Sequence, residues 1–593
     1  MGEAPIVPAP APPDAPLLFY RRGKRWPRAI AWFGFKSFWG HLWHLGASVV
    51  ATEDIDCRDW MHPDEPDALT ARIAGVIGAA KPHAASLTEA VEGDVWIDFV
   101  ADTGDDFSVS KAVARLIFAE YEVDGVHLPR GHMLVFGGDT AYPVATDIEI
   151  HNRIVVPFGQ ILRHLDDGRT RALLGIPGNH DWFSGLDGFG RMFRGRRTQQ
   201  KLDRSSIIAP AADSPTSRRN EGQKDDEVDR LGQIGHVIEW VEAFRLGRFV
   251  IKRAALALRG YTPVQSASYW AIRLAPDLDF WGIDRQLRLV DFHQRGYFAE
   301  VTDESRGVVL CMADPVYAFL EPNPNGVRAL QSLDLSIERD GLLVMTGDTH
   351  HYCRQDLGEG MHVIAGGGGA FLHPACIARG GLPAPAAEFP GRTTSIALAL
   401  QVPWQIVHGR SGFLVHVVVA LTYLPLFGAQ WSTGNAGTAA SIVTALVVAV
   451  ACLLLGGWRQ KAKRIGLLAV ATGVAFGFLP LAGHELVHWG SLKLSLAPAP
   501  LHLAGAAYAL SVYGGTLAIG TYLMLLTLLG IEQHQAFSAL AHPGYKHFVR
   551  MRVRRDGSGV DGWVLGRVDP LSQKDKVVLV DRFFWKNPKH KAS

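Results

Sequence analysis

The chain has 593 residues, a formal net charge of +1 and a mean hydropathy of +0.08, and 48% of its residues are hydrophobic. This balance creates no global field that would attract nucleic acid or a strongly acidic partner. The length exceeds what one hydrophobic core usually fills, so we expect several domains.

Residues 1–60 are expected to form an N-terminal segment. Its first part, 1–16, is rich in Ala and Pro and is predicted to be disordered. In 28–51, Trp and Phe recur near helical spacing beside a cluster of Arg and Lys. This pattern fits an amphipathic helix at a membrane interface, and it fits equally a helix packed on the protein's own domain.

Residues 61–400 repeat one pattern, in which a short apolar strand runs into polar residues and glycine. The strands are expected at 96–101, 133–136, 172–176 and 342–346. Loops at strand ends are where α/β scaffolds place ligands and catalysts. The candidate functional residues in these loops are Asp102, Asp139, Tyr142, Asn179, His180, Asp181, Asp348 and His350.

The residue types in these loops are those that bind metals. Carboxylates, imidazoles and amide oxygens suit Mn, Fe, Zn or Mg. One carboxylate can bridge two metals about 3.5–4 Å apart. The glycines let the backbone approach an ion or a phosphate closely. The loops therefore predict a site for two divalent or trivalent metal ions, whose identity the sequence leaves open.

In chain order, the motifs are D-T-G from Asp102, G-D-T-A-Y ending at Tyr142, G-N-H-D ending at Asp181, and G-D-T-H ending at His350. They resemble the motifs of the calcineurin-like metallophosphoesterases. A glycine stands for the usual His of the first motif. Together with Tyr142, this variant resembles the purple acid phosphatase branch, in which a tyrosinate binds a ferric ion. The resemblance covers about 95–375 and implies an α/β fold, an αββα sandwich of two mixed sheets.

The resemblance also implies the metal ligands and the reaction. The implied ligands are Asp102, Asp139, Tyr142, Asn179, Asp348 and His350. Asp139 would bridge the two metals, and Tyr142 is either a ligand or a side chain packed beneath the site. The implied reaction is hydrolysis of a phosphomonoester or phosphodiester by a hydroxide that two metals activate. His180 would be the general acid or a phosphate contact, and Asp181 would orient it.

Two departures from the family pattern affect the second metal. Ala313 stands where the family has an isolated His, and Asp348 replaces the first His of the last motif. Asp348, and Asp314 after a backbone shift, could supply carboxylates in their place. The second site is then either rich in carboxylate or weak. A degenerate site would make the protein a non-catalytic membrane scaffold that binds a phosphorylated ligand.

Two further segments of this domain each fit more than one interpretation. Residues 190–235 are polar and are expected to be an insertion, most simply a solvated loop. The four glycines at 366–369 match the family's Gly-rich turn after the last strand, or form a flexible loop.

Residues 411–531 are strongly apolar and are expected to form a transmembrane domain of four helices. The apolar runs are 413–430, 438–458, 465–486 and 501–531. A span needs roughly 20 apolar residues. The basic loop at 459–464 is expected on the cytoplasmic side. Four spans then leave the catalytic domain and both termini cytoplasmic. Five scattered cysteines without a C-x-x-C pair fit buried thiols in such a reducing compartment.

The tail, 532–593, contains strand-like runs at 548–552 and 577–584 and is expected to pack back on the cytosolic domain. The expected partners are a phosphoester substrate and the lipid bilayer, with no nucleic acid. A membrane-associated substrate is consistent with the anchor.

A rival function comes from H-E-x-x-H at His484, Glu485 and His488. On a helix this spacing puts two imidazoles on one face for zinc, with the glutamate as base. An intramembrane metalloprotease is therefore the alternative enzyme. The non-catalytic interpretation is that these residues are simply polar side chains near the end of a helix, at the membrane interface.

Overall fold

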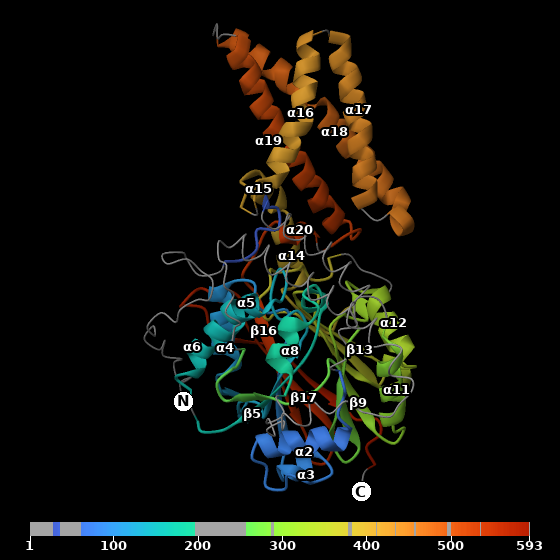
Figure 1. The fold of residues 1–593 in the computed structure, drawn as a ribbon. Coiled ribbons are helices and arrows are strands. Elements are labelled where there is room, and N and C mark those ends of the chain that lie inside the picture. The colour runs from blue at the N-terminus through green and yellow to red at the C-terminus, as the bar shows by residue number, and fades with distance from the viewer. Residues whose placement is uncertain are drawn as a thin grey trace, which may run out of the picture.

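A computed structural model describes residues 28–35, 61–165, 167–195, 256–285, 290–377, 382–410, 412–432, 434–455, 458–494, 500–533 and 535–591. Most of the expected interfacial helix over 28–51 and most of the insertion at 190–235 lie outside these residues. The described residues contain an α/β part with two mixed seven-stranded sheets, and a bundle of long apolar helices above it (Figure 1).

The first sheet has the strand order β18-β17-β16-β1-β4-β5-β6. Strands β1, β4, β5 and β6 are parallel, while β16, β17 and β18 add antiparallel to the free edge of β1. Its strands are β1 Val95–Val100, β4 Met133–Gly137, β5 Arg171–Ile176, β6 Tyr261–Pro263, β16 Lys546–Val553, β17 Gly559–Arg567 and β18 Val578–Lys586.

The second sheet has the order β15-β13-β14-β12-β9-β8-β7, with β14, β12, β9 and β8 parallel. Its strands are β7 Trp270–Ala275, β8 Leu278–Ile283, β9 Gly307–Met312, β12 Leu343–Thr346, β13 Tyr352–Leu357, β14 Gly360–Ala365 and β15 Ala387–Phe389. Two small ribbons lie apart: β2 Tyr121–Val123 with β3 Val126–Leu128, and β10 Tyr317–Ala318 with β11 Glu321–Pro322.

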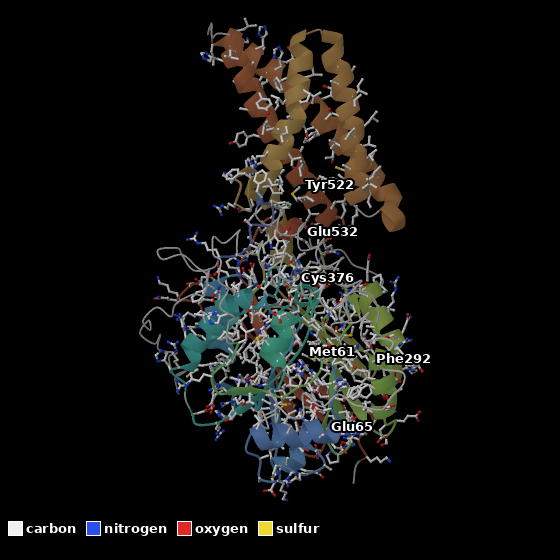
Figure 2. The ribbon with its side chains drawn as sticks, in the orientation of Figure 1. Met61, Glu65, Phe292, Cys376, Tyr522 and Glu532 are labelled. Carbon is white, nitrogen blue, oxygen red and sulfur yellow. The ribbon has the colours of Figure 1, made fainter. Side chains whose placement is uncertain are left out.

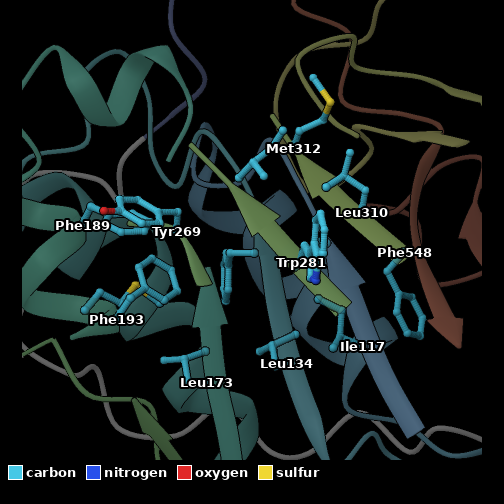
Figure 3. Packing of buried hydrophobic residues seen from close by; sticks show 14 of the residues in the cluster. Ile117, Leu134, Leu173, Phe189, Phe193, Tyr269, Trp281, Leu310, Met312 and Phe548 are labelled. Atoms are coloured by element: carbon cyan, nitrogen blue, oxygen red, sulfur yellow. The ribbon is translucent and has the colours of Figure 1, made fainter. Parts of the chain in front are cut away.

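The two sheets pack face to face. In β4, Val135 belongs to the core between the sheets, whereas its neighbours Leu134 and Phe136 belong to the core on the outer faces. Strand β9 alternates in the same way, with Val309 inside and Leu310 outside. This alternation follows from the two-residue period of a strand. Figure 3 shows part of the outer core, including Leu134, Leu310 and Trp281.

Helices cover the outer faces of the sandwich, with α4 and α6 on one side and α11 and α12 on the other (Figure 1). The helices of this part are α2 Pro66–Val76, α3 Leu87–Ala90, α4 Phe107–Ile117, α5 Asp147–Ile150, the π-helix His151–Val155, α6 Val156–Leu162, α7 Asn179–Trp182, α8 Asp187–Phe193, α11 Phe292–Val301, α12 Pro324–Ser332 and α13 Ile337–Asp340. Three short helices flank the apolar bundle in the chain: α14 Arg392–Ala399 and α15 Val402–Val407 precede it, and α20 Gln535–Ser538 follows it. Residues 28–35 lie at its base, where the backbone N–H of Leu414 donates to the carbonyl oxygen of Phe33.

The apolar bundle consists of α16 Leu414–Ser432, α17 Gly434–Leu455, α18 Trp458–Lys493 and α19 Pro500–Leu528. Three of these are long and apolar enough to cross a membrane, over Gly437–Leu454, Ile465–Lys493 and Leu501–Leu528. In α16 the described apolar stretch, Leu414–Phe427, is shorter than a span. Three candidate spans therefore stand where the sequence led us to expect four.

The bundle and the sandwich share a hydrophobic cluster. Leu372 and Ile377, from the loop after β14, are buried in one cluster with Tyr522 and Leu526 of α19. The backbone N–H of Ile377 also donates to Oε1 of Gln533 at 3.0 Å. The apolar bundle therefore contacts the loop that follows β14, and the same loop borders the candidate site.

Candidate metal centre

The sequence motifs meet at one edge of the sandwich because they follow the carboxyl ends of parallel strands from both sheets. Asp102 follows β1, Asp139 follows β4, and Asp348 follows β12. Each of these aspartates has a positive φ, of 57°, 48° and 64°. Such backbone costs of order 1–3 kcal/mol per residue and concentrates at functional sites. Three strained carboxylates at adjacent strand ends mark this edge as the candidate site.

The hydroxyl of Tyr142 is the meeting point of the side chains. It lies 3.2 Å from Oδ1 of Asp102, 3.3 Å from Oδ2 of Asp139 and 3.0 Å from Nε2 of His350. All four of these residues are among the metal ligands that the motif resemblance implies. The two carboxylates and the imidazole surround the phenol hydroxyl. Their own ligand atoms are not all within 4.8 Å of one another, so among the described residues these three side chains do not form a compact ligand group by themselves. Asp102, Asp139, His350 and Tyr142 are therefore the side chains that would hold a cation at this point.

His350 is oriented by the loop after β14. Its Nδ1 lies 2.7 Å from the carbonyl oxygen of Phe371, which can only accept, so Nδ1 carries the proton and Nε2 is left with a lone pair. The ring stacks on His373 at 4.1 Å between centroids, and the backbone N–H of His350 donates to Nδ1 of His373 at 3.0 Å. Nε2 points to Tyr142 and stands 3.9 Å from Oδ1 of Asp102. This is the tautomer and direction that a metal ligand needs.

The carboxylates lie against glycine backbone. A Cβ at Gly178 would stand 2.1 Å from Oδ1 of Asp139, and one at Gly366 would stand 2.4 Å from Oδ2 of Asp102. That Oδ2 is buried and has no hydrogen-bond partner among the described residues. A buried carboxylate oxygen without a donor is unfavourable unless a cation faces it. The Gly-rich segment 366–369 is therefore part of the cradle of this site.

The electrostatics of the site call for positive charge. Burial, and then the charges of Asp139 and Asp348, raise the pKa of Asp102 well above its usual value. Burial raises the pKa of Asp139 to about 7, with Asp314 adding to the rise and Arg285 opposing it. Because these carboxylates resist ionising together, a bound cation would relieve the conflict. The donor set, two carboxylates, a phenol and an imidazole, fits one such cation.

The second metal position has a different composition from the family pattern. Asn179 and Asp348 are both half-buried at its rim. Asp314, the possible substitute for a lost imidazole, forms a buried ion pair with Arg285 and accepts a hydrogen bond from Nδ2 of Asn325 at 3.3 Å. Its carboxylate is thus already engaged. The charge of Arg285 opposes the rise in the pKa of both Asp314 and Asp139, so the guanidinium supplies fixed positive charge to these two carboxyl groups.

His180 and Asp181 have separate surroundings. Nδ1 of His180 lies 2.5 Å from the carbonyl oxygen of Pro143, and its backbone N–H donates to Oδ1 of Asp139 at 2.9 Å. The Asp181 carboxylate accepts from the backbone N–H groups of Gly178, at 2.9 Å, and Thr140, at 3.3 Å. The His180 ring is therefore held by a carbonyl. Asp181, which was expected to orient it, ties together the two loops that carry Asp139 and Asn179.

Trp32 covers the site from the N-terminal segment. Its ring lies 6.3 Å from that of Tyr142, 6.2 Å from that of His180 and 5.4 Å from that of Phe371, all edge-on. The segment is fixed because the backbone N–H of Ile30 donates to Oδ1 of Asp105 at 2.7 Å. Sequence reasoning left residues 28–51 open between a membrane-interface helix and a helix packed on the protein's own domain. A single Trp far from every motif gave no signal of this position.

Lys546, the first residue of β16, is a second feature that the motifs did not reveal. Its side chain is fully buried, and Nζ donates to the carbonyl oxygen of Ala370 at 2.6 Å. The backbone N–H of Ala370 in turn donates to the carbonyl oxygen of Asp102 at 2.9 Å. Burial lowers the pKa of Lys546 to about 7, while Asp105 and Asp102 oppose that shift. The strand after the apolar bundle thus brings an amine beside the candidate metal centre.

The H-E-x-x-H residues lie near the end of α18, remote in the chain from these loops. His484, Glu485 and His488 are exposed, and the two imidazole planes are 5° apart with centroids 6.5 Å apart. In the described part of the chain, no third His, Cys, Asp or Glu completes a compact ligand group with them. Among the described residues, the motif therefore offers two imidazoles and a glutamate without a third metal ligand.

No protein-family model matches the chain, and no curated protein matches it. Among solved structures, the chain is similar to one described as "GAP50 the anchor in the inner membrane complex of Plasmodium". The TM-score is 0.31 and the sequence identity 9%, over 50% of this chain and 78% of that chain. A likeness this distant carries no inference about activity, so the chemistry of the site has to be argued from its own residues.

Proposed function

We propose that this chain is a membrane-anchored, metal-dependent phosphoesterase. The observation that carries the proposal is the convergence of Asp102, Asp139 and His350 on the hydroxyl of Tyr142, each within 3.3 Å. A folded core gains nothing from burying two carboxylates together, since an unpaired buried charge is costly. A cation makes the arrangement favourable, and phosphoester hydrolysis is the reaction that the motif resemblance associates with it.

In the proposed reaction, the residues of the site have different roles: some would hold the cations, and others would bind the phosphate group. Cations held there would supply Lewis acidity, which activates water and neutralises charge on phosphate oxygens. Asp102, Asp139, Tyr142 and His350 would hold the first, and Asn179 with Asp348 would face the second. Arg285 would add fixed positive charge next to the bridging position, where it favours a phosphate anion.

His180 is our candidate for the proton donor to the leaving oxygen. With Nδ1 donating to Pro143, the neutral ring has no proton on Nε2. Burial lowers the pKa of His180 to about 4, so the free site holds it neutral. The negative charge of a bound phosphoester favours the second proton, which Nε2 can then pass to the leaving group.

A membrane-associated phosphoester is the favoured substrate class, as monoester or diester. The loop that orients His350 through Phe371 continues into Leu372 and Ile377, which pack against α19. The site therefore lies close to the junction with the apolar bundle, where a headgroup would be presented. Trp32 offers an aromatic surface at its mouth.

We further propose that the bundle crosses the membrane four times, with the sandwich in the cytoplasm. Strands β1 and β16 pair in one sheet, although the bundle separates them in the chain. The chain must leave and re-enter the same compartment, which requires an even number of crossings. The shorter helix α16 is then the fourth span, and the basic loop at 459–464 faces the cytoplasm.

The test uses the full chain purified in detergent. We expect bound transition metal and hydrolysis of p-nitrophenyl phosphate or bis(p-nitrophenyl) phosphate, both abolished in Asp139→Ala. Glu304→Gln, an exposed carboxylate on the loop before β9, serves as control and should keep metal and rate. Glu485→Gln should also keep both, which separates this function from the protease alternative. Full metal content and rate in Asp139→Ala would end the assignment, and metal without turnover would favour a binding scaffold.

A further inference from the structure

A second group of metal-binding side chains lies outside the centre described above. Cys353, Cys376 and Glu388 each offer a ligand atom, and these atoms all lie within 4.8 Å of one another. We propose that this thiolate cluster binds a thiophilic divalent cation, zinc in the first place, as a metal site separate from the phosphoesterase centre.

The fold brings the cluster together from three segments. Cys353 on β13 and Glu388 on β15 are cross-strand partners in the second sheet. Cys376 comes from the loop after the Gly-rich segment, and its backbone N–H donates to Oε1 of Glu388 at 3.0 Å. Residues that are adjacent in register on a sheet and joined by a backbone hydrogen bond hold their side chains in a fixed relation. The ligand atoms are therefore pre-positioned.

The dimensions and ligand types suit zinc. Zinc bonds of about 2.3 Å to sulfur and 2.0–2.2 Å to a carboxylate oxygen place tetrahedral ligand atoms about 3.5–3.8 Å apart. This spacing lies inside the limit that the cluster satisfies. Thiolates select zinc over Mn or Mg, which prefer oxygen ligands. Three protein ligands leave a fourth position open to water, and the half-buried Glu388 gives that position access to solvent.

The surroundings make the cluster unfavourable without a cation. Both thiols are buried, and their apolar neighbours are Leu320 and Ile364. The hydrogen bond with Cys353, followed by burial, raises the pKa of the Cys376 thiol. Among the described residues, no Lys or Arg forms an ion pair with the Glu388 carboxylate that lies against the two thiols. A bound divalent cation would ionise the thiols and pair with all three groups.

The cluster has a structural consequence for the loop that carries Cys376. The same loop holds the Phe371 carbonyl on His350 and stacks His373 against that ring. Figure 2 shows Cys376 on the side of the sandwich that faces the apolar helices, below Glu532 and Tyr522. A metal that joins Cys376 to β13 and β15 would anchor this loop between the helices and the sheet.

The experiment uses cobalt as a spectroscopic substitute for zinc in the full-length, detergent-purified protein under reducing conditions. Thiolate-bound Co²⁺ gives a sulfur-to-metal charge-transfer absorption, and none of the four described cysteines is among the proposed ligands of the phosphoesterase centre. We expect this absorption in the wild type and in Asp139→Ala, and its loss in Cys353→Ser and Cys376→Ser. Cys311→Ser, a buried thiol on β9, is the matched control and should keep it. Persistence in Asp139→Ala separates this site from the proposed active centre.

A second measurement needs no variant and so does not depend on how the serine proteins fold. Alkylation of the zinc-loaded wild type, mapped by peptide mass spectrometry, should spare Cys353 and Cys376 until a chelator is added. The proposal is overturned if the cobalt protein shows no charge-transfer absorption, or if chelation leaves the alkylation pattern unchanged. It is also overturned if the two thiols are found as a disulfide in protein purified without oxidant.

Discussion

At the scale of single residues, the geometry of the candidate metal centre depends on the backbone that holds its side chains as well as on the identity of those side chains. Asp102, Asp139 and Asp348 all occupy left-handed backbone, which presents their carboxylates at the tips of strands. The glycines beside them allow that approach, because any Cβ at Gly178 or Gly366 would collide with a carboxylate oxygen. The site is therefore sensitive to small changes of backbone as well as to loss of a ligand.

His180→Ala tests the proton donor. We expect the rate to fall by roughly 10²–10⁴-fold, the usual contribution of a general acid, with metal content unchanged because His180 is not among the first metal's ligands. The rate should be measured together with metal analysis on p-nitrophenyl phosphate. His164→Ala, an exposed imidazole, is the control. An unaltered rate in His180→Ala would assign the proton transfer to another group.

Trp32→Ala tests the cover over the site. The indole makes three edge-on contacts, and each such aromatic pair contributes about 0.5–1.5 kcal/mol. Removing it should open the mouth and lower the KM for a small soluble aryl phosphate several-fold, with metal content unchanged. Phe35→Ala, whose ring is 53% exposed in the same segment, should leave KM as it was. If both substitutions changed the KM equally, the effect would come from the N-terminal segment as a whole, and the specific role of the Trp32 indole would be wrong.

Lys546→Met tests the buried amine through the pH dependence of stability. The lysine pKa is about 7 in the folded chain and about 10.4 when unfolded. Between these values only the unfolded chain binds the proton, so folded stability rises with pH, and below pH 7 the cost of burying the charge is fully present. Methionine removes that cost. The rise in Tm of the variant over wild type should be largest near pH 6.5 and should shrink toward pH 10.

The control for this titration is Lys574→Met, an exposed lysine, which should change Tm little at either pH. A difference in Tm between Lys546→Met and wild type that stays constant from about pH 6.5 to about pH 10 would mean that the amine does not titrate in this window.

The motif residues could be predicted from sequence because each follows an apolar strand, a local signal. The contributions of Trp32, Lys546 and the Phe371 carbonyl could not. A backbone carbonyl has no sequence signature, and the other two are single residues that reach the site only through long-range packing. Asp181 was visible in the motif, but its partners, two backbone N–H groups, depend on how the loops fold.

At the scale of elements, the structure contains all four strands expected from the motifs. The strands expected at 96–101, 133–136, 172–176 and 342–346 correspond to β1, β4, β5 and β12. Their short apolar runs between polar residues are typical of strands buried on both faces. In the tail, β16 and β18 were indicated by apolar runs, whereas β17, Gly559–Arg567, was not. Three glycines interrupt β17, and glycine is depleted in strands. Close packing against β16 and β18 overrides that preference.

The pairing of β1 with β16 is fixed by a fully buried ion pair. Nε of Arg550 lies 2.6 Å from Oδ1 of Asp98, and the guanidinium also donates to the carbonyls of Ile117, Ala119 and Leu128. Arg550→Ala leaves the carboxylate buried and unpaired, so we expect a loss of about 3–5 kcal/mol in stability. Thermal denaturation in detergent is the measurement.

The double substitution Asp98→Leu with Arg550→Met is the matched control for the ion pair. It removes both charges and should recover most of the lost Tm, since replacing a buried pair by apolar residues is often neutral. The recovery should be incomplete because three carbonyls lose their donor. A double variant as unstable as Arg550→Ala would show that charge is not the cause.

At the scale of the whole molecule, the pairing of β1 and β16 makes a prediction about topology. Reporter fusions after residues 433 and 497 should lie on the side of the membrane opposite the sandwich, and a fusion after residue 460 should lie on the same side. The reason is that the chain has to return to the sheet it left. A fusion after 433 found on the same side as the sandwich would mean that α16 does not cross.

The same pairing also governs how the protein is made. Asp98 and Arg550 are 452 positions apart, so β1 is synthesised long before its neighbour and leaves the ribosome with a bare edge. The amine of Lys546 and the outer three strands are synthesised only after the apolar helices. A chain stalled before that point lacks both β16, which covers the edge of β1, and the buried amine. The candidate site is therefore completed only when the last segment of the chain has been made.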